Sequence, residues 1–204
     1  MNSRQRDACD LVPGLAPIAD RLIVYEQILL RWQRKINLVG RSTLEDVWRR
    51  HFADSARLAQ LAPLDVRWAD LGSGAGFPGM VIALMQVECH AGEMHLIESD
   101  TRKAAFLREV SRETGAGAHI HNARCEDVLP DLQLDVVCSR AMTDMKGLLG
   151  YVKPFVEKGA IGLFMKGRDV AAELTQASIP SNFLISFAPS KIDADSTIVQ
   201  VRTA

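Results

Sequence analysis

A glycine-rich stretch that follows an acid is the part of the sequence best suited to hold a cofactor. It reads Asp70-Leu71-Gly72-Ser73-Gly74-Ala75-Gly76-Phe77-Pro78-Gly79 and lies between an expected strand, 67–71, and an expected helix, 80–87. Glycines suit this place because a tight turn requires positive φ and because no Cβ should obstruct a ligand that lies on the backbone. The carboxyl ends of parallel strands are also where such sheets bind ligands. The stretch therefore predicts a cofactor-binding loop.

The loop has to be assigned to one of two adenosine-containing cofactors. Gly74 to Gly79 matches the G-x-G-x-x-G pattern of dinucleotide-binding enzymes, which is weak evidence when it stands alone. A carboxylate at Asp70 favours the cationic methionyl group of S-adenosylmethionine and does not favour a pyrophosphate. Pro78 removes a backbone N–H that a dinucleotide loop could offer to phosphate. The loop therefore predicts S-adenosylmethionine, with an NAD-dependent oxidoreductase and a ligand-free turn as the alternatives.

Glu98 supplies a second contact for an adenosine group. It ends the expected strand 94–98, and a carboxylate at that place can accept hydrogen bonds from both hydroxyls of a ribose. NAD enzymes use the same device, so Glu98 supports adenosine without choosing between the two cofactors. Asp100, two residues further on, is the competing candidate.

The elements that must position these residues alternate between strands and helices from residue 66 onwards. Strands are expected at 67–71, 94–98, 118–121, 135–139 and 160–166, and helices at 80–87, 102–114 and 144–156. Such alternation with short connections predicts an α/β fold, a mostly parallel sheet with helices on both faces. Two last strands, 182–188 and 197–202, are expected to form an antiparallel hairpin.

The chain before this sheet is expected to be helical. Apolar residues recur every three or four positions over 18–36, which is the stripe of an amphipathic helix. A second helix is expected over 42–61. We therefore expect residues 1–64 to form an N-terminal helical extension of a domain at 65–204, the two making one compact unit.

Composition favours a soluble globular protein of the cytosol. The 204 residues are 48% hydrophobic and 24% charged, which is ordinary for such proteins. The first residues lack the apolar stretch of a signal peptide, and no run approaches the roughly 20 apolar residues that span a bilayer. The four cysteines form no Cys-x-x-Cys pair, so free thiols and no metal site are expected.

The charge is unevenly distributed. A net charge of −1 argues against a protein that coats nucleic acid indiscriminately. Residues 21–60 nevertheless hold an excess of basic side chains, namely Arg21, Arg31, Arg34, Lys35, Arg41, Arg49, Arg50 and Arg57 against Glu26, Glu45, Asp46 and Asp54. This excess permits either a positive face for a polyanion or an ordinary solvated helix surface.

Four further short motifs accompany the glycine loop. They are Asn37-Leu38, Arg50-His51-x-x-Asp54-Ser55, Ser139-Arg140-Ala141 and Lys166-Gly167, and with the loop they span residues 37–167. The Gly-Phe-Pro-Gly ending of the loop and the Arg-His-x-x-Asp-Ser segment are far more specific than a bare glycine loop. On these motifs the chain resembles the RsmG family (also called GidB), which methylates small-subunit ribosomal RNA.

The resemblance implies a Rossmann-like class I methyltransferase with a seven-stranded sheet and extra N-terminal helices. It also implies transfer of a methyl group from S-adenosylmethionine to N7 of a guanine in the 530 loop of 16S rRNA, position 527 in the usual rRNA numbering. Cofactor contacts of the family map onto Gly72, Phe77, the Cys125-Glu126 pair and Arg140. Cys125 stands where the family usually has alanine, which matters little if only its backbone amide reaches the adenine.

These arguments together give the site residues. For the cofactor they are Asp70, Gly72, Gly74, Gly76, Phe77, Glu98, Cys125, Glu126 and Arg140. For RNA phosphate they are Arg50, His51, Arg140 and Lys166, since arginine offers a bidentate fork and lysine a point charge. His51 has a second interpretation, as a core histidine held by Asp54.

The chemistry at guanine N7 requires little of the protein. N7 carries an exposed lone pair and no proton, so no general base is needed, and alignment of the reacting atoms can supply about 7–11 kcal/mol of barrier reduction. Asp54 or Asp70 could stabilise the positive charge left on the base. The other functions that stay open are a small-molecule methyltransferase of the same fold and a non-catalytic RNA-binding protein of ribosome assembly.

Overall fold

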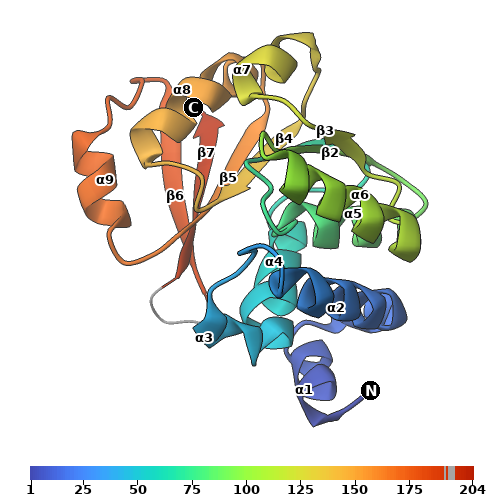
Figure 1. Cartoon of the computed structure of the whole chain (residues 1–204). Coiled ribbons are helices and arrows are strands. Elements are labelled where there is room, and N and C mark those ends of the chain that lie inside the picture. Colours follow the sequence, from blue (N-terminus) through green and yellow to red (C-terminus); the bar gives the residue numbers. More distant parts are fainter. Residues whose placement is uncertain (191, 193–195) are drawn as a thin grey trace.

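Residues 1–190, 192 and 196–204, which the computed structural model describes, contain one seven-stranded sheet (Figure 1). The strand order is β3-β2-β1-β4-β5-β7-β6. The strands are β1 (Arg67–Leu71), β2 (Glu93–Ile97), β3 (His119–His121), β4 (Val136–Arg140), β5 (Ile161–Lys166), β6 (Phe183–Pro189) and β7 (Thr197–Thr203). Strands β1 to β5 run parallel, and β7 pairs antiparallel with both β5 and β6. The predicted α/β class and the C-terminal antiparallel hairpin are confirmed.

Strand β1 shows how both faces of the sheet come to be covered. Its side chains alternate between the faces, as in any strand. Trp68 packs into the hydrophobic core on one face, whereas Ala69 and Leu71 pack into the core on the other. All three are fully buried, as expected for a parallel strand with helices on either side.

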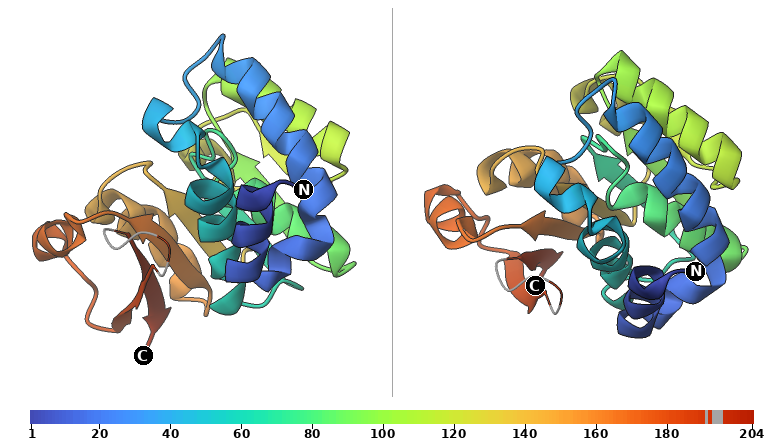
Figure 2. Two further views of the ribbon diagram at one scale, coloured as in Figure 1. Left: turned by 90° about the horizontal axis from the view of Figure 1, so that it is seen from below. Right: turned by 60° about the horizontal axis from the view of Figure 1, so that its bottom comes forward.

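The helices divide between these two cores. One face carries α5 (Gly79–Glu88) and α6 (Thr101–Thr114), and the other carries α7 (Cys125–Val128), α8 (Met145–Val156) and α9 (Val170–Gln176). The N-terminal helices are α1 (Ser3–Leu11), α2 (Ala19–Gln33), α3 (Arg41–Leu44) and α4 (Asp54–Ala56). Figure 2 shows them beside α5 and α6, on the same side of the sheet.

The N-terminal helices share the core of the sheet. Leu22 and Tyr25 on α2 are fully buried, in the same hydrophobic cluster as Met80 and Phe106 of α5 and α6. The indole N–H of Trp32 donates to Glu109 on α6 at 2.7 Å. The predicted helix over 18–36 is thus present as α2, which begins at Ala19 and ends at Gln33.

The prediction of a single helix over 42–61 is wrong. α3 ends at Leu44, a π-helical turn covers Trp48–Ala53, and α4 and a 3₁₀ turn, Arg57–Gln60, follow. Every residue from 51 to 58 is buried, whereas a surface helix buries one stripe and exposes the rest. The segment is therefore a buried and interrupted helix, and a π turn of this kind is rare and often found at functional sites.

Three helices lie where none was expected, α1, the four-residue α7 and α9. The start of α1 has a sequence pattern typical of a helix N-terminus. The Asn2 side chain accepts from the Gln5 amide, and the Gln5 side chain accepts from the Asn2 amide. This reciprocal pair is a capping box. α9 is only seven residues long and has no comparable signal. Within the part of the chain that the structure describes, no helix is long and apolar enough to cross a membrane.

Candidate active site

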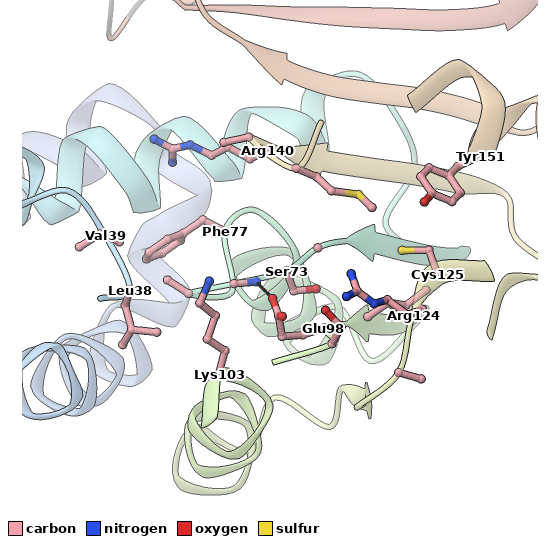
Figure 3. Close-up of a pocket in the computed structure, with 18 of the residues that line it drawn as sticks. Leu38, Val39, Ser73, Phe77, Glu98, Lys103, Arg124, Cys125, Arg140 and Tyr151 are labelled. Atoms are coloured by element: carbon pink, nitrogen blue, oxygen red, sulfur yellow. Dashed lines mark hydrogen bonds between the residues drawn. The ribbon is translucent and has the colours of Figure 1, made fainter. Parts of the chain in front are cut away.

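A cavity of about 470 Å³ lies at the carboxyl ends of β1, β2 and β4 (Figure 3). Parallel sheets bind ligands at this edge, and the volume is that of a small-molecule site. Its wall consists of residues 38–39, 51, 72–75, 77, 97–99, 103, 123–126, 140–142 and 151. We call the part around Gly74, Glu98, Cys125 and Glu126 the Glu98 end, and the part around Leu38, Val39, His51, Phe77 and Arg140 the Arg140 end.

The glycine loop forms the floor between these two ends. Gly72, Gly74 and Gly76 have φ values of 65°, 54° and 86°, so the predicted positive φ is confirmed. A Cβ at Gly76 would overlap the Tyr25 hydroxyl and would stand 3.0 Å from Cβ of Met80. Only glycine fits there, because the backbone turn and the packing of α2 both exclude a side chain.

Four amides of the loop already donate to acceptors of the protein. The bonds they donate are Ser73 N to Ile97 O (3.0 Å), Gly74 N to Glu98 Oε2 (2.8 Å), Gly76 N to Ser73 O (2.6 Å) and Gly79 N to Asp70 Oδ2 (3.1 Å). A dinucleotide loop instead offers its amides to a pyrophosphate. The loop geometry therefore disfavours NAD.

Asp70 lies beneath the loop and is fully buried. Its Oδ2 accepts from the Gly79 amide at the start of α5, and its Oδ1 has no hydrogen-bond partner among the described residues. Burial raises the pKa of the Asp70 carboxyl to about 7, although the Gly79 hydrogen bond opposes the rise. Asp70 is not part of the cavity wall, so the expected direct contact with the methionyl group is corrected to support of the loop from below.

Glu98 and Asp100, the two candidates for the ribose, have different positions. Glu98 lines the cavity, and each carboxylate oxygen already accepts one amide, from Gly74 at 2.8 Å and from Asp100 at 2.7 Å. Asp100 instead caps α6, where it accepts from the amides of Arg102 and Lys103. These two bonds, led by the one from Lys103, lower the pKa of the Asp100 carboxyl. The structure therefore favours Glu98 as the ribose ligand.

Cys125 and Glu126 begin α7 at the far side of the Glu98 end. Burial raises the pKa of the Cys125 thiol to about 11, and the nearby Glu126 carboxylate adds to this rise. Glu126 is held by the Tyr151 hydroxyl of α8, which donates to its carboxylate. That hydrogen bond lowers the pKa of Glu126 and raises the pKa of Tyr151 to about 12.

Arg140 extends from the end of β4 over the Arg140 end. Its guanidinium points away from Glu98 and toward the N-terminal helices (Figure 3). Nη1 donates to Nδ1 of His51 at 2.8 Å and to the Arg50 carbonyl at 3.4 Å. The His51 ring in turn stacks on Phe77, with the centroids 4.7 Å apart. Four predicted site residues are thus joined in one contact network.

The other predicted RNA and catalytic residues are not at the cavity wall. Asp54 is buried and pairs with Arg57 at 3.2 Å and with the Ser190 hydroxyl at 3.1 Å, so it neither holds His51 nor faces the cavity. Lys166 is also buried, and its ammonium donates to the Thr143 carbonyl and contacts Glu173. The structure therefore corrects both residues to supports of neighbouring segments.

An adenosyl group fits the residues at the Glu98 end. A carboxylate has about four lone-pair sites, and Glu98 uses two of them for amides. The remaining two match the two hydroxyls of a ribose. A Cβ at Gly74 would have no atom nearer than 3.7 Å, so the backbone there is open to a ligand. Ala123 and the buried Cys125 supply an apolar wall beside it.

Sequence reasoning missed several residues of the wall. Tyr151 comes from α8 and Met142 from the loop after β4, and Arg124 also lines the cavity. Met142 lies where a Cβ on Gly72 would come within 2.7 Å of it. No motif points to these side chains, because they reach the cavity only through the packing of separate elements.

Comparisons with known proteins show which family the chain resembles in sequence. A sequence model of the family described as "rRNA small subunit methyltransferase G" matches residues 18–193. Proteins named ribosomal RNA small subunit methyltransferase G are similar to the chain: that of Methylorubrum extorquens (strain PA1) is 46% identical, with 90% of this chain and 87% of that protein covered. That of Rhodospirillum centenum is 49% identical, with 89% and 82% covered.

Solved structures share the fold at low sequence identity. A methyltransferase from Geobacter sulfurreducens has a TM-score of 0.60 at 14% identity and covers 91% of this chain and 89% of its own. A mutant of MtNAS in complex with S-adenosylmethionine has a TM-score of 0.60 at 14% identity, with 90% and 75% covered. These likenesses place the chain in the methyltransferase fold class.

Proposed function

Because the chain belongs to the family of rRNA small subunit methyltransferases G, we propose that it methylates N7 of one guanine in 16S rRNA. It is an S-adenosylmethionine-dependent methyltransferase of small-subunit rRNA. The finer assignment, to the 530 loop and position 527 in the usual rRNA numbering, follows the family resemblance of the sequence. A substrate in the small ribosomal subunit would place the enzyme in the cytoplasm.

The Glu98 end is the proposed seat of the cofactor. When bound, S-adenosylmethionine supplies an electrophilic methyl group on a positively charged sulfur. Glu98 binds the ribose hydroxyls, while Cys125 and Glu126 flank the adenine. The loop amides that already donate within the protein and the carboxylate beside Gly74 disfavour a pyrophosphate at the same place.

The observation that supports the N7 assignment is that the candidate bases in the cavity wall are hydrogen-bonded to neighbours or protonated. Glu98 and Glu126 are both held by neighbours, and His51 accepts from Arg140 at one ring nitrogen and contacts Thr43 at the other. The Cys125 thiol has a pKa near 11, which keeps it protonated. Among the described residues of the wall, none is thus arranged as a general base. Guanine N7 requires none, since it presents a lone pair and no proton.

The protein therefore acts by orientation and by excluding water. Leu38, Val39 and Met142 give the Arg140 end an apolar wall against which a base can lie. Alignment of N7 with the methyl group can supply about 7–11 kcal/mol of barrier reduction. No residue has to change its protonation state during such a transfer.

Basic residues around the cavity are proposed to contact RNA phosphate. Lys103 and Arg124 line the mouth, and Arg50 lies on the π-helical turn beside Arg140. If each neutralises a phosphate, the affinity for RNA should fall steeply as the salt concentration rises. A flat salt response would contradict these contacts.

The proposed function is tested by methyl transfer to ribosomal substrates. The protein is incubated with S-adenosylmethionine labelled in the methyl group and with small subunits, extracted 16S rRNA or large subunits. Label is expected in 16S rRNA, and borohydride reduction with aniline cleavage should break the chain at a single N7-methylguanosine. Label in no RNA would contradict the enzyme assignment. Label at another atom or base would contradict the N7 assignment alone.

A further inference from the structure

We propose that His51 is a positioning residue of the methyl-transfer reaction, which fixes the segment 37–44 against the Arg140 end of the cavity. It does so as a neutral ring held between Arg140 on one side and Thr43 on the other. This inference rests on the proposed function, and it differs from the RNA contact that the sequence suggests for His51.

The hydrogen bonds around His51 specify its tautomer. A guanidinium can only donate, so Nδ1 of His51, 2.8 Å from Nη1 of Arg140, carries no proton and accepts. In a neutral ring the proton then lies on Nε2, which donates to Oγ1 of Thr43 at 2.9 Å. The Thr43 hydroxyl donates onward to the Gly40 carbonyl at 2.9 Å. A directed chain thus runs from Arg140 to Gly40.

The surroundings of the ring keep it neutral. The His51 residue is 5% exposed and stacks on Phe77 at an interplanar angle of 14°. Burial, together with the charges of Arg140 and Arg50, lowers the pKa of His51 to about 3. With both ring nitrogens engaged, the ring offers no donor to an RNA phosphate. Its chemistry is that of a rigid connector.

The segment that this connector holds forms one wall of the reaction site. Leu38 and Val39 line the cavity beside Phe77 (Figure 3). The side chain of Gln33 on α2 binds the backbone of both residues. It accepts from the amides of Leu38 and Val39 at 3.0 and 3.1 Å, and it donates to the Val39 carbonyl at 2.9 Å. The segment is thus held at two points, by Gln33 near its start and by the chain of hydrogen bonds through Thr43 near its end.

This arrangement couples the wall to the loop after β4. Arg140 is the last residue of β4, and Ala141 and Met142 of the loop that follows also line the cavity. If the chain of hydrogen bonds is cut at Thr43, the wall and the loop can shift relative to each other while the Glu98 end keeps its contacts. A shift of about 1 Å in a reacting group can cost on the order of 100-fold in rate. The loss should therefore appear in the transfer step and not in cofactor affinity.

Thr43 offers the cleanest variants, because it lies outside the cavity wall. Thr43→Val keeps the shape and removes both hydrogen bonds, and Thr43→Ser restores the hydroxyl. Thr175→Val is the matched control, since the Thr175 hydroxyl also bonds a backbone carbonyl, at 2.9 Å, on an exposed helix away from the cavity. Each protein is assayed for single-turnover methyl transfer to small subunits and for affinity toward S-adenosylhomocysteine.

We expect Thr43→Val, which cuts the chain of hydrogen bonds at one residue, to lower the transfer rate about tenfold. Cofactor affinity should stay within about twofold of wild type. Thr43→Ser and Thr175→Val should stay within about twofold of wild type in both assays. An unchanged rate in Thr43→Val would overturn the proposal. So would an equal loss in Thr43→Ser, because packing and not the hydroxyl would then be responsible.

A spectroscopic test does not depend on methyl transfer at all. In protein labelled with ¹⁵N-histidine, the His51 signals are identified by their absence in His51→Phe. We expect an unprotonated Nδ1 and a protonated Nε2, unchanged from pH 8 to pH 5. The opposite tautomer, or a ring that gains a proton in this range, would overturn the proposal. If the wild-type protein methylated no RNA, the proposed function would be wrong. The tautomer of His51 would still decide whether the ring connects Arg140 to Thr43 as proposed.

Discussion

The two ends of the cavity are built in different ways. At the Glu98 end the ligand candidates come within a few residues of a strand: Gly72 and Gly74 follow β1, Glu98 follows β2, and Cys125 and Glu126 follow β3. At the Arg140 end, His51 and Arg140 are 89 positions apart in the sequence and meet only because the N-terminal helices pack against the domain. If the proposed function holds, local loops bind the cofactor, whereas long-range contacts orient the transfer.

Removing the Glu98 carboxylate should have the largest effect, and it should be confined to the cofactor. Glu98→Ala loses two charge-assisted bonds to the ribose and leaves the Gly74 amide without its acceptor. At about 1.5–3 kcal/mol for each hydrogen bond to a charged group, we expect affinity for S-adenosylhomocysteine to fall by on the order of 100-fold or more. Isothermal titration calorimetry measures this change.

The matched control for that variant is Glu157→Ala on the surface of α8, where the carboxylate pairs with Lys153 at 2.8 Å. It should leave the affinity unchanged. If Glu98→Ala bound the cofactor about as tightly as wild type, the ribose would have to be held elsewhere, and the proposed division of the cavity would not hold.

Asp70 allows a test of the loop through pH. Its folded-state pKa of about 7 lies above the ordinary value of 3.8, so the folded protein retains a proton that the unfolded chain releases between these values. Stability should therefore fall as the pH rises from about 4 to 7 and should level off above that. At about 1.4 kcal/mol for each pKa unit, the loss between pH 5 and pH 8 is on the order of 2–3 kcal/mol.

Asp70→Asn should remove this slope. Denaturant unfolding of both proteins at pH 5 and pH 8 measures the difference, because every other titrating group is common to the two. Equal pH dependence in the wild type and the variant would mean that Asp70 is ionised in the folded state throughout this range.

Tyr25 connects the N-terminal helices to the glycine loop. The free energy of unfolding of a Tyr25 variant therefore measures how much this long-range contact contributes. Its buried hydroxyl donates to the Ala75 carbonyl, and its ring stacks on Phe77. Tyr25→Phe keeps the ring and leaves a buried carbonyl unpaired, which should cost about 1–3 kcal/mol of unfolding free energy. Tyr151→Phe, which loses an exposed hydrogen bond, should cost less. A neutral Tyr25→Phe would show that α2 does not anchor the loop through this bond.

The Glu98 end of the site could be predicted from the sequence better than the Arg140 end. The strand ends, the positive φ of the loop glycines and the place of Glu98 at the end of a strand in the cavity wall could be predicted, since each depends on a few neighbouring residues. The broken winding around His51 could not be predicted, because the segment packs against distant parts of the chain, such as Arg140 at His51 and Ser190 at Asp54. The buried partners of Asp54 and Lys166, which are Arg57 and Glu173, depend equally on tertiary packing.

The sequence also could not predict which side chains face the cavity. Asp70 has the residue type and spacing of a cofactor ligand, yet its side chain points under the loop toward the Gly79 amide. A strand alternates its side chains between two faces, but the sequence does not say which face meets the ligand. Tyr151 and Met142 show the reverse case, since both line the cavity without any motif.

The most direct test of the two-ended cavity is the single-turnover rate of methyl transfer to small subunits, measured against cofactor concentration for Glu98→Gln and Thr43→Val. We predict that a saturating concentration of S-adenosylmethionine restores the rate of Glu98→Gln to near that of wild type. The rate of Thr43→Val should stay about tenfold low at every concentration. Recovery of Thr43→Val at high cofactor, with Glu98→Gln remaining slow, would contradict the assignment of the two ends.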